Sequence, residues 1–331
     1  MNRSLFLILI FLFFSNCSSN KDEISLDGQR IDVQEIRNTK EILTKQNREE
    51  QEFNPLLELQ LLGGEFNNNP INNQNNIGEL SYEGNLEKVG KYKFSKFNDF
   101  EYLDIQPIFY NEYVIFSDNK GAIILYDQNQ NIIWKKNIYD KSEKKLRPRL
   151  NFARYKNILI VTDDIAKYYA IDIETGDIVW SKNNIVPFNS EIKIKDNFFY
   201  TVDYKNILRS FSIKDGEETW NIKTEESLTK SNTKISIVIK NKNIYFSNSI
   251  GDITAVDLKS GQLVWQLPTQ NNDISKNAFL LSSSKLVIDE DSIFFSNNRN
   301  EFYSIDTITG LINWKNEISS NLQPIVIDNF I

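Results

Sequence analysis

Residues 170–180 read AIDIETGDIVW, and this stretch decides the fold. It is an apolar run, a turn marked by Asp172, Thr175 and Gly176, and a second apolar run that ends in Trp180. Aspartate accepts backbone N–H groups two residues on, and glycine adopts positive φ at little cost. We therefore expect two antiparallel strands joined by a hairpin loop of four or five residues.

The chain repeats this hairpin, and all five of its tryptophans occupy the same final position. They are Trp134, Trp180, Trp220, Trp265 and Trp314. The separations are 46, 40, 45 and 49 residues, with a mean of 45. A period near this length, with several short strands per unit, is typical of a β-propeller blade.

The turn residues recur with the tryptophans, as an acceptor side chain followed four positions later by glycine or asparagine. The pairs are Asp127 and Asn131, Asp172 and Gly176, Ser212 and Gly216, Asp257 and Gly261, and Asp306 and Gly310. Ser212 is the weaker acceptor, and asparagine tolerates the left-handed region best after glycine. The residue two positions before each acceptor is small in four units, which suits a crowded position between neighbouring blades. These residues are Ala170, Ser210, Ala255 and Ser304, with Leu125 in the first unit.

A further strand pair precedes each hairpin. One strand is expected in each of the ranges 112–118, 157–163, 197–203, 243–249 and 292–298. Several have another β-rich segment before them, such as 236–240 or 285–289. Their apolar faces fit sheets that are packed on both sides. The sequence therefore predicts an all-β propeller domain over residues 92–331, with five full four-stranded units and the start of a sixth.

The five tryptophans have two possible roles. They could form a ligand-stacking array, or each indole could pack on the next blade and donate its N–H to a backbone carbonyl. Equal spacing around a ring disperses the side chains and does not bring them to one pocket. We therefore interpret them as structural blade-docking residues.

Composition excludes several classes of function. The 331 residues carry a net charge of −7, which argues against a nucleic-acid surface. There is no histidine, the commonest general base and metal ligand. The only cysteine is Cys17, so the propeller domain has neither an intramolecular disulfide nor a thiolate nucleophile.

The N-terminus reads as an export signal. Arg3 precedes an apolar run over residues 5–14, which is too short to cross a bilayer and fits a signal peptide over residues 1–16. The segment FSNC, ending at Cys17, resembles a bacterial lipobox, although it has Phe14 and Asn16 at atypical positions. The alternative is cleavage elsewhere and an incidental cysteine. Lipidation of Cys17, followed by Ser18 and not by aspartate, implies an outer-membrane anchor that faces the periplasm.

Residues 17–91 are expected to form a largely disordered polar tether. Charges alternate from residue 21 to 52, and residues 67–76 read NNNPINNQNN, so little apolar area is available to offset ordering entropy. Residues 55–62, PLLELQLL, are the exception. They are either a partner-binding element or a segment that packs on the propeller.

The pattern A-x-D-x-x-T-G-x-x-x-W in residues 170–180, and nearly so in residues 255–265, resembles the PQQ-like propeller repeat. Together with the lipobox, it resembles the BamB family of the outer-membrane β-barrel assembly machinery. The short segment DGQRI at residues 27–31 is similar to the leader of alphaproteobacterial members. The resemblance implies an eight-bladed, non-enzymatic periplasmic scaffold without a cofactor. Its implied partners are the periplasmic domains of the barrel-forming subunit and unfolded outer-membrane proteins.

Other functions remain open at this point. A quinoprotein dehydrogenase shares the repeat, but the family resemblance there implies a longer chain with a calcium site and adjacent cysteines. Asp163 with Asp164, and the run Asp289, Glu290 and Asp291, are conceivable calcium ligands, but we expect them to be solvated turn carboxylates. A surface adhesin or other scaffold and a propeller enzyme of another chemistry are the remaining alternatives. For a propeller enzyme of another chemistry, the sequence offers no recognisable nucleophile, base or phosphate loop.

The last residues, 328–331, parallel residues 196–199 at the start of a strand. Five units and a fragment are fewer than the eight of the family. We therefore expect a C-terminal truncation; the alternative is that residues 92–98 complete a blade.

Overall fold

The computed structural model describes residues 107–225, 234–269, 281–326 and 331. The chain divides into two compact units, Met1–Gln60 and Leu61–Ile331, and every described residue lies in the second. The expected signal peptide and tether, and the first part of the expected propeller domain, lie outside the described residues. So do residues 327–330 of the expected sixth unit.

The described chain forms five four-stranded antiparallel sheets, which we call blades 1 to 5 in chain order. Blade 1 contains β1 (Ile108–Tyr110), β2 (Tyr113–Ser117), β3 (Ile123–Tyr126) and β4 (Ile132–Lys136). Blade 2 contains β5 (Leu150–Tyr155), β6 (Ile158–Asp163), β7 (Lys167–Asp172) and β8 (Ile178–Asn183). Blade 3 contains β9 (Lys193–Lys195), β10 (Phe198–Val202), β11 (Ile207–Ser212) and β12 (Glu218–Lys223). Blade 4 contains β13 (Ile237–Lys240), β14 (Asn243–Ser247), β15 (Ile253–Asp257) and β16 (Leu263–Leu267). Blade 5 contains β17 (Val287–Asp289), β18 (Ser292–Asn297), β19 (Glu301–Asp306) and β20 (Ile312–Asn316).

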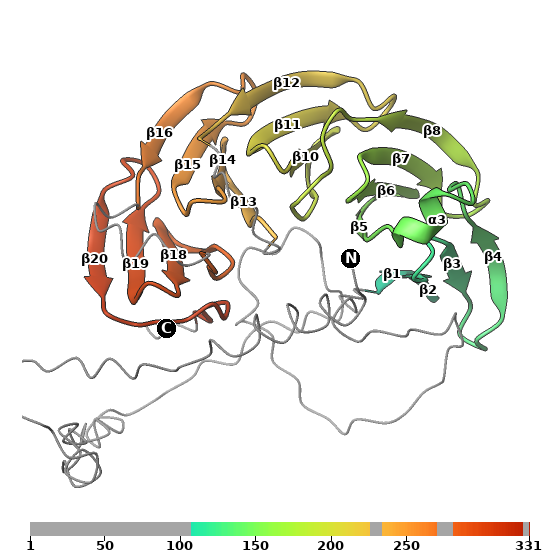
Figure 1. The fold of residues 1–331 in the computed structure, drawn as a ribbon, viewed down its shortest axis with the longest axis horizontal. Helices are drawn as coiled ribbons and strands as arrows, with labels where there is room; N and C mark the ends of the chain where they lie inside the picture. Colours follow the sequence, from blue (N-terminus) through green and yellow to red (C-terminus); the bar gives the residue numbers. More distant parts are fainter. Residues whose placement is uncertain (1–106, 226–233, 270–280, 327–330) are drawn as a thin grey trace, which may run out of the picture. The chain divides into compact units, whose positions relative to one another are not determined.

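The predicted fold class, four-stranded propeller blades, is confirmed. The strands of each blade pair in sequence order, as meanders do. First strands of neighbouring blades contact one another, from β1 to β5, β9, β13 and β17. Figure 1 shows the blades following one another in chain order, with the first strands β1, β5 and β13 on the inner side and β4, β8, β12, β16 and β20 on the outer side.

The hydrophobic core lies between the blades. One cluster joins Leu125 and Ile123 of blade 1 to Leu159 and Val161 of blade 2, and the next joins Phe188 and Phe199 to blade 2. Two further clusters join blades 3 and 4 and blades 4 and 5. Middle strands such as β6 are therefore buried on both faces, whereas outer strands such as β8 alternate between exposed and half-buried residues. Burial on both faces explains why the middle strands of the repeat are apolar along most of their length.

Each tryptophan hairpin contains a β-bulge at the same place. In blade 2 the register runs from Ala170 opposite Trp180 to Ile171 opposite Ile178, so one residue of β8 is left over. The other four blades shift register at the equivalent step. The small residue that recurs in the sequence is thus the cross-strand partner of the tryptophan, as Ala170, Ser210, Ala255 and Ser304 all show.

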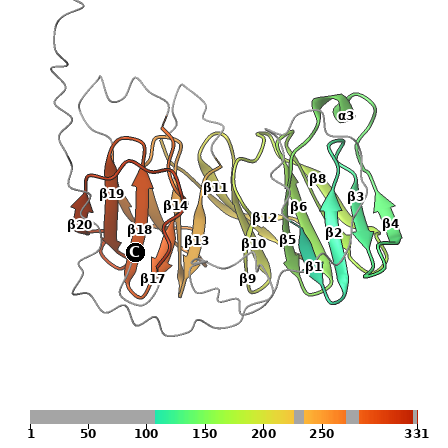
Figure 2. The same cartoon turned by 90° about the horizontal axis from the view of Figure 1, so that it is seen from below.

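The only helix among the described residues is a single turn, α3 (Glu143–Leu146). It lies in the connection from blade 1 to blade 2, residues 137–149, which we call the α3 loop. Figure 2 shows α3 at one end of the blades, beyond the ends of the strands. The repeat does not account for this loop.

Candidate functional site

The tryptophans of blades 1 to 4 lie against the hairpin turn of the following blade. Trp134 donates its indole N–H to the Ile173 carbonyl oxygen at 2.8 Å, Trp180 donates to Ile213 at 2.9 Å, and Trp265 donates to Thr307 at 3.0 Å. The glycine of the same turn lies close against each ring. We propose that these contacts dock each blade on the next.

The fit between indole and turn leaves no room for a side chain. A Cβ atom built on Gly216 would lie 2.7 Å from Trp180, and one built on Gly261 would lie 2.6 Å from Trp220. Gly176 against Trp134 and Gly310 against Trp265 are equally close, at 2.9 and 2.5 Å. These four glycines have φ between 70° and 73°, in the left-handed region. Glycine is thus required twice over, by backbone conformation and by close approach.

The turn aspartates hold the hairpin loops. Oδ1 of Asp172 accepts the N–H groups of Glu174 and Thr175 at 2.9 and 3.1 Å. Asp257 and Asp306 accept the two equivalent N–H groups of their own turns. Hydrogen bonds from Ser260 and Thr309 hold the pKa values of Asp257 and Asp306 below their usual range. These carboxylates therefore stabilise the hairpin loops to which they belong.

Two turns differ from the sequence prediction. In blade 1 the left-handed residue is Gln130, with φ of 67°, and not Asn131. Because that loop is one residue shorter, Asn131 instead donates its backbone N–H and its side-chain amide to Asp127, which lowers the pKa of Asp127. In blade 3 the Asp215 carboxylate, and not the predicted Ser212, accepts a turn N–H, which Glu217 donates at 3.2 Å. The Ser212 hydroxyl instead bonds to Asp215.

Trp314 has a different environment from the other four. Its side chain is 37% exposed, and it contacts Phe294 and Phe302 of its own blade. These rings, with Val326 and Ile318, line an open groove of about 520 Å³. Within the described residues, no turn glycine lies against this tryptophan.

A second set of turn residues was missed in the sequence analysis. An aspartate or asparagine at or just after the end of each second strand is buried: Asp118, Asp163, Asp203, Asn248 and Asn297. In the first four, the side-chain oxygen accepts N–H groups two and four residues on; for Asp203 these are Lys205 and Ile207, at 2.8 and 3.2 Å. Recurrence once per unit at the end of a predicted strand was the available signal.

The expectation that Asp163 is a solvated turn carboxylate is therefore wrong. Its side chain is fully buried, and the Tyr139 hydroxyl of the α3 loop bonds to it. Asp164 accepts the N–H of Arg149 at 2.8 Å and lies 3.7 Å from the Arg149 guanidinium. In the run Asp289, Glu290 and Asp291, the Asp291 carboxylate lies 3.7 Å from the Lys240 ammonium. No group of three or more potential metal-ligating side chains occurs among the described residues.

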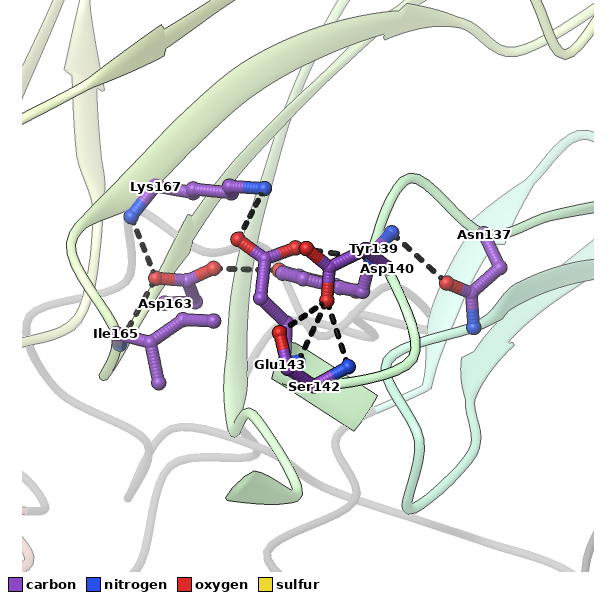
Figure 3. A network of polar contacts seen from close by, with 8 residues as sticks. All are labelled: Asn137, Tyr139, Asp140, Ser142, Glu143, Asp163, Ile165 and Lys167. Carbon is purple, nitrogen blue, oxygen red and sulfur yellow. Dashed lines mark hydrogen bonds and ion pairs between the residues drawn. The ribbon is translucent and has the colours of Figure 1, made fainter. Parts of the chain in front are cut away.

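Figure 3 shows how Asp163 joins the α3 loop to blade 2. The Tyr139 hydroxyl donates to Oδ2 of Asp163 at 2.5 Å, while Oδ1 accepts the N–H groups of Ile165 and Lys167. Burial raises the pKa of Asp163 to about 6 and also raises the pKa of Tyr139. The Lys167 ammonium lies 5.4 Å from the centre of the Tyr139 ring and pairs with Glu143 at 2.6 Å.

The α3 loop is also stabilised by hydrogen bonds between its own residues. The Asp140 carboxylate accepts the N–H groups of Ser142 and Glu143 at 2.7 and 2.9 Å, and the Glu143 carboxylate accepts the N–H of Asp140 at 3.0 Å. This reciprocal pattern is that of a capping box. On the blade 1 side, a Cβ on Gly121 would lie 2.4 Å from the Tyr139 ring and 2.9 Å from Pro148. The loop is thus fixed to two blades at once.

A separate charged group lies near the first strands of blades 3 and 5. Glu191 pairs with Lys193 at 3.4 Å and with Lys285 of blade 5. Burial opposes the charge of Glu191, but the two lysines together hold its pKa at about 2. Burial lowers the pKa of Lys193, whose side chain is 6% exposed. This ion-pair group links two blades that are not neighbours in the chain.

Cys17, the predicted lipidation site, and residues 55–62 lie outside the described residues. In the segments that the structure does describe, none of the helical structure is long and apolar enough to cross a bilayer.

Known proteins share this geometry and parts of the sequence. The family model for "Outer membrane protein assembly factor BamB" matches residues 104–331. The BamB protein of Francisella tularensis subsp. tularensis is 24% identical over 178 residues, which are 51% of this chain and 36% of that protein. The chain thus aligns with little more than a third of that curated relative.

Solved structures agree on the fold. The crystal structure of BamB from Moraxella catarrhalis superimposes with a TM-score of 0.55 at 16% identity, covering 70% of this chain and 68% of that one. Quinohemoprotein alcohol dehydrogenase from Comamonas testosteroni gives 0.53 at 12% identity, covering 67% and 45%. At such identities both matches establish a shared propeller fold alone. Since the family model covers well over half of the sequence, the chain belongs to the family of the outer membrane protein assembly factor BamB.

Proposed function

We propose that this chain is a non-enzymatic scaffold lipoprotein that assists the assembly and insertion of outer-membrane β-barrel proteins through protein–protein contacts. The observation that carries the proposal is the family match over residues 104–331, which includes every described blade. The proposed partners are the periplasmic domains of the barrel-forming subunit and unfolded outer-membrane proteins.

The outer strands of the blades support a role in protein binding. β4, β8, β12, β16 and β20 are each the last strand of their sheet, so each has one edge without a strand partner in that sheet. Several apolar side chains on them are about half exposed: Ile132, Ile133, Val179, Leu263 and Val264. An extended polypeptide can add to such an edge through main-chain hydrogen bonds.

The alternative of a quinoprotein dehydrogenase rests on a shared fold, and fold does not determine activity. Among the described residues, the acidic groups with strongly shifted pKa values already have intrachain partners. Asp163 is bonded to Tyr139 beneath the α3 loop, and Glu191 is paired with two lysines. These contacts support structural roles for both carboxylates.

Membrane attachment is part of the proposal and depends on Cys17. We propose that Cys17 is acylated and holds the protein on the periplasmic face of the outer membrane. Replacement of Cys17 by serine is expected to move the protein from the membrane fraction to the soluble periplasmic fraction. A Cys17→Ser protein that stays in the membrane fraction would exclude this anchor.

The function is tested by affinity purification of the full-length lipidated protein from envelope extracts. We expect recovery of the barrel-forming subunit, and slower maturation of outer-membrane β-barrel proteins in cells that lack this chain. A preparation without any subunit of the assembly machinery, from cells with normal barrel maturation, would favour another propeller scaffold or a surface adhesin.

A further inference from the structure

We propose that the tip of the α3 loop, residues 144–147, docks on an acidic segment of a partner protein. In this arrangement Leu146 enters an apolar pocket, and Lys144 and Lys145 pair with carboxylates of the partner. The inference rests on the proposed function only in that the propeller acts through protein contacts. It assigns the surface and the chemistry of one such contact.

The first observation is that the loop is held rigidly from both sides. Tyr139 bonds to Asp163 and Glu143 pairs with Lys167, both on blade 2, while Tyr139 and Pro148 pack on Gly121 of blade 1. Ordering a flexible loop on binding costs free energy, so a loop that is already fixed binds more tightly for the same contacts. Figure 3 shows Tyr139 and Glu143 extending from the loop towards Asp163 and Lys167.

The second observation is what the fixed loop presents. Leu146 is 65% exposed, and the side chains of Lys145 and Arg147 are also exposed. Within the part of the chain that the structure describes, neither the Lys144 nor the Lys145 ammonium forms an ion pair. A single exposed leucine is common on protein surfaces. A leucine beside two lysines that form no ion pair within the described chain, at the tip of a loop fixed to two blades, is a more specific arrangement.

The third observation is that the loop is basic although the whole chain is acidic. Residues 141–149 contain five basic residues and one acidic residue, whereas the chain has a net charge of −7. Glu143 is engaged with Lys167 and Arg149 with Asp164, so one residue of each sign is paired and the loop keeps an excess of basic residues. A local basic group on an acidic protein orients an approaching acidic surface towards that group.

The size of the tip favours a protein partner over a membrane. An interfacial membrane helix buries a long apolar face with several large side chains. α3 has four residues and contributes one leucine. One apolar side chain flanked by lysines matches a pocket with an acidic rim, because protein interfaces combine an apolar centre with a polar rim.

The test is site-specific photocrosslinking with the full-length protein in Gram-negative cells. A photoreactive phenylalanine analogue replaces Leu146, and the same analogue at Ile185, which is 91% exposed in the connection after blade 2, is the control position. We expect a discrete adduct from position 146 whose crosslinked partner peptide contains acidic residues. The double variant Lys144→Glu/Lys145→Glu should reduce the adduct at least fivefold.

The matched control is Lys242→Glu/Lys259→Glu, which changes the net charge equally on exposed lysines of blade 4. Near-ultraviolet circular dichroism confirms that each variant is folded. Equal adducts from positions 146 and 185, a partner peptide without acidic residues, or equal losses in the two double variants would overturn the inference. So would phosphatidylglycerol vesicles that bind the protein through Lys144 and Lys145.

The outcomes separate this inference from the proposed function. If Lys144→Glu/Lys145→Glu leaves copurification of the assembly machinery intact and the adduct unchanged, the inference fails and the proposed function stands. If the adduct maps to an acidic segment of a protein outside that machinery, the docking surface stands and the proposed function loses support.

Discussion

Replacement of Asp163 by asparagine removes a negative charge that the fold holds in a fully buried position. The geometry at this site is compatible with an amide. Asn248 occupies the equivalent position in blade 4, where its side-chain oxygen accepts N–H groups two and four residues on. In Asp163→Asn the oxygen keeps the N–H groups of Ile165 and Lys167, and the amide nitrogen can donate to the Tyr139 oxygen.

The magnitude follows from the pKa of Asp163. Burial raises it from 3.8 to about 6, which corresponds to about 3 kcal/mol at 1.36 kcal/mol per unit. Below pH 3.8 the carboxyl is protonated in both the folded and the unfolded state. As the pH rises from there through 6, the buried charge increasingly destabilises the folded state, so the free energy of unfolding falls. The asparagine side chain does not titrate, so the variant should be more stable than the wild type at neutral pH by about 1 to 3 kcal/mol.

Asp203→Asn is the matched control, because it makes the same change at the same position of blade 3. Asp203 is also fully buried, but its Oδ2 accepts from Nε and Nη2 of Arg209 at 3.1 and 3.0 Å. The Arg209 side chain is 11% exposed and would keep Glu218 as a counter-charge. Removing one partner of a buried ion pair costs about 3 to 5 kcal/mol, and the remaining partner reduces this to about 2 to 4 kcal/mol.

The assay is urea unfolding followed by tryptophan fluorescence, at pH 7.5 and at pH 4.5, with the chain from residue 18 onward. Asp163→Asn should raise the unfolding midpoint at pH 7.5 and differ less from the wild type at pH 4.5. Asp203→Asn should lower the midpoint at pH 7.5. If Asp163→Asn destabilises as much as Asp203→Asn, or if its effect does not depend on pH, the reasoning about the buried charge is refuted.

Three further predictions concern other described sites. Gly216→Val should lower the free energy of unfolding by about 2 to 4 kcal/mol, because a left-handed backbone and the Trp180 ring both exclude a side chain; an unchanged melting temperature would contradict this. Gln130→Gly should stabilise by about 0.5 to 1 kcal/mol, because Gln130 has φ of 67°, and a lower melting temperature would count against left-handed strain there. Glu191→Gln should destabilise by about 1 to 3 kcal/mol at pH 7, because it leaves Lys193 without its carboxylate. Since the pKa of Glu191 is about 2, this loss should shrink as the pH falls from 4.5 towards 2, and chemical denaturation across that range checks it.

Much of the fold was predictable because each blade is specified locally. The position of Trp180, the turn from Asp172 to Gly176 and the apolar run of β6 all lie within one stretch of about 25 residues. The period of the tryptophans then predicted the architecture. The prediction at Asn131 was wrong because a loop shortened by one residue moves the left-handed position to Gln130.

The polar sites were less predictable. Asp163, Asp203 and Asn248 look like ordinary turn residues in the sequence, and nothing local distinguishes a buried side chain from a solvated one. The hydrogen-bond partner of Asp163, Tyr139, comes from the connection between two blades. The sequence analysis made no prediction for that connection.

The sequence by itself determined the all-β class, the four-stranded blade and the position of each tryptophan hairpin. These depend on side-chain alternation, turn chemistry and a fixed period, which are properties of neighbouring residues. Only the tertiary structure decided which carboxylates are buried, which tryptophan faces an open groove, and that the α3 loop is fixed to two blades with its basic tip exposed. The physical reason is that burial and electrostatic partners come from segments far apart in the chain, and packing of the blades alone brings them together.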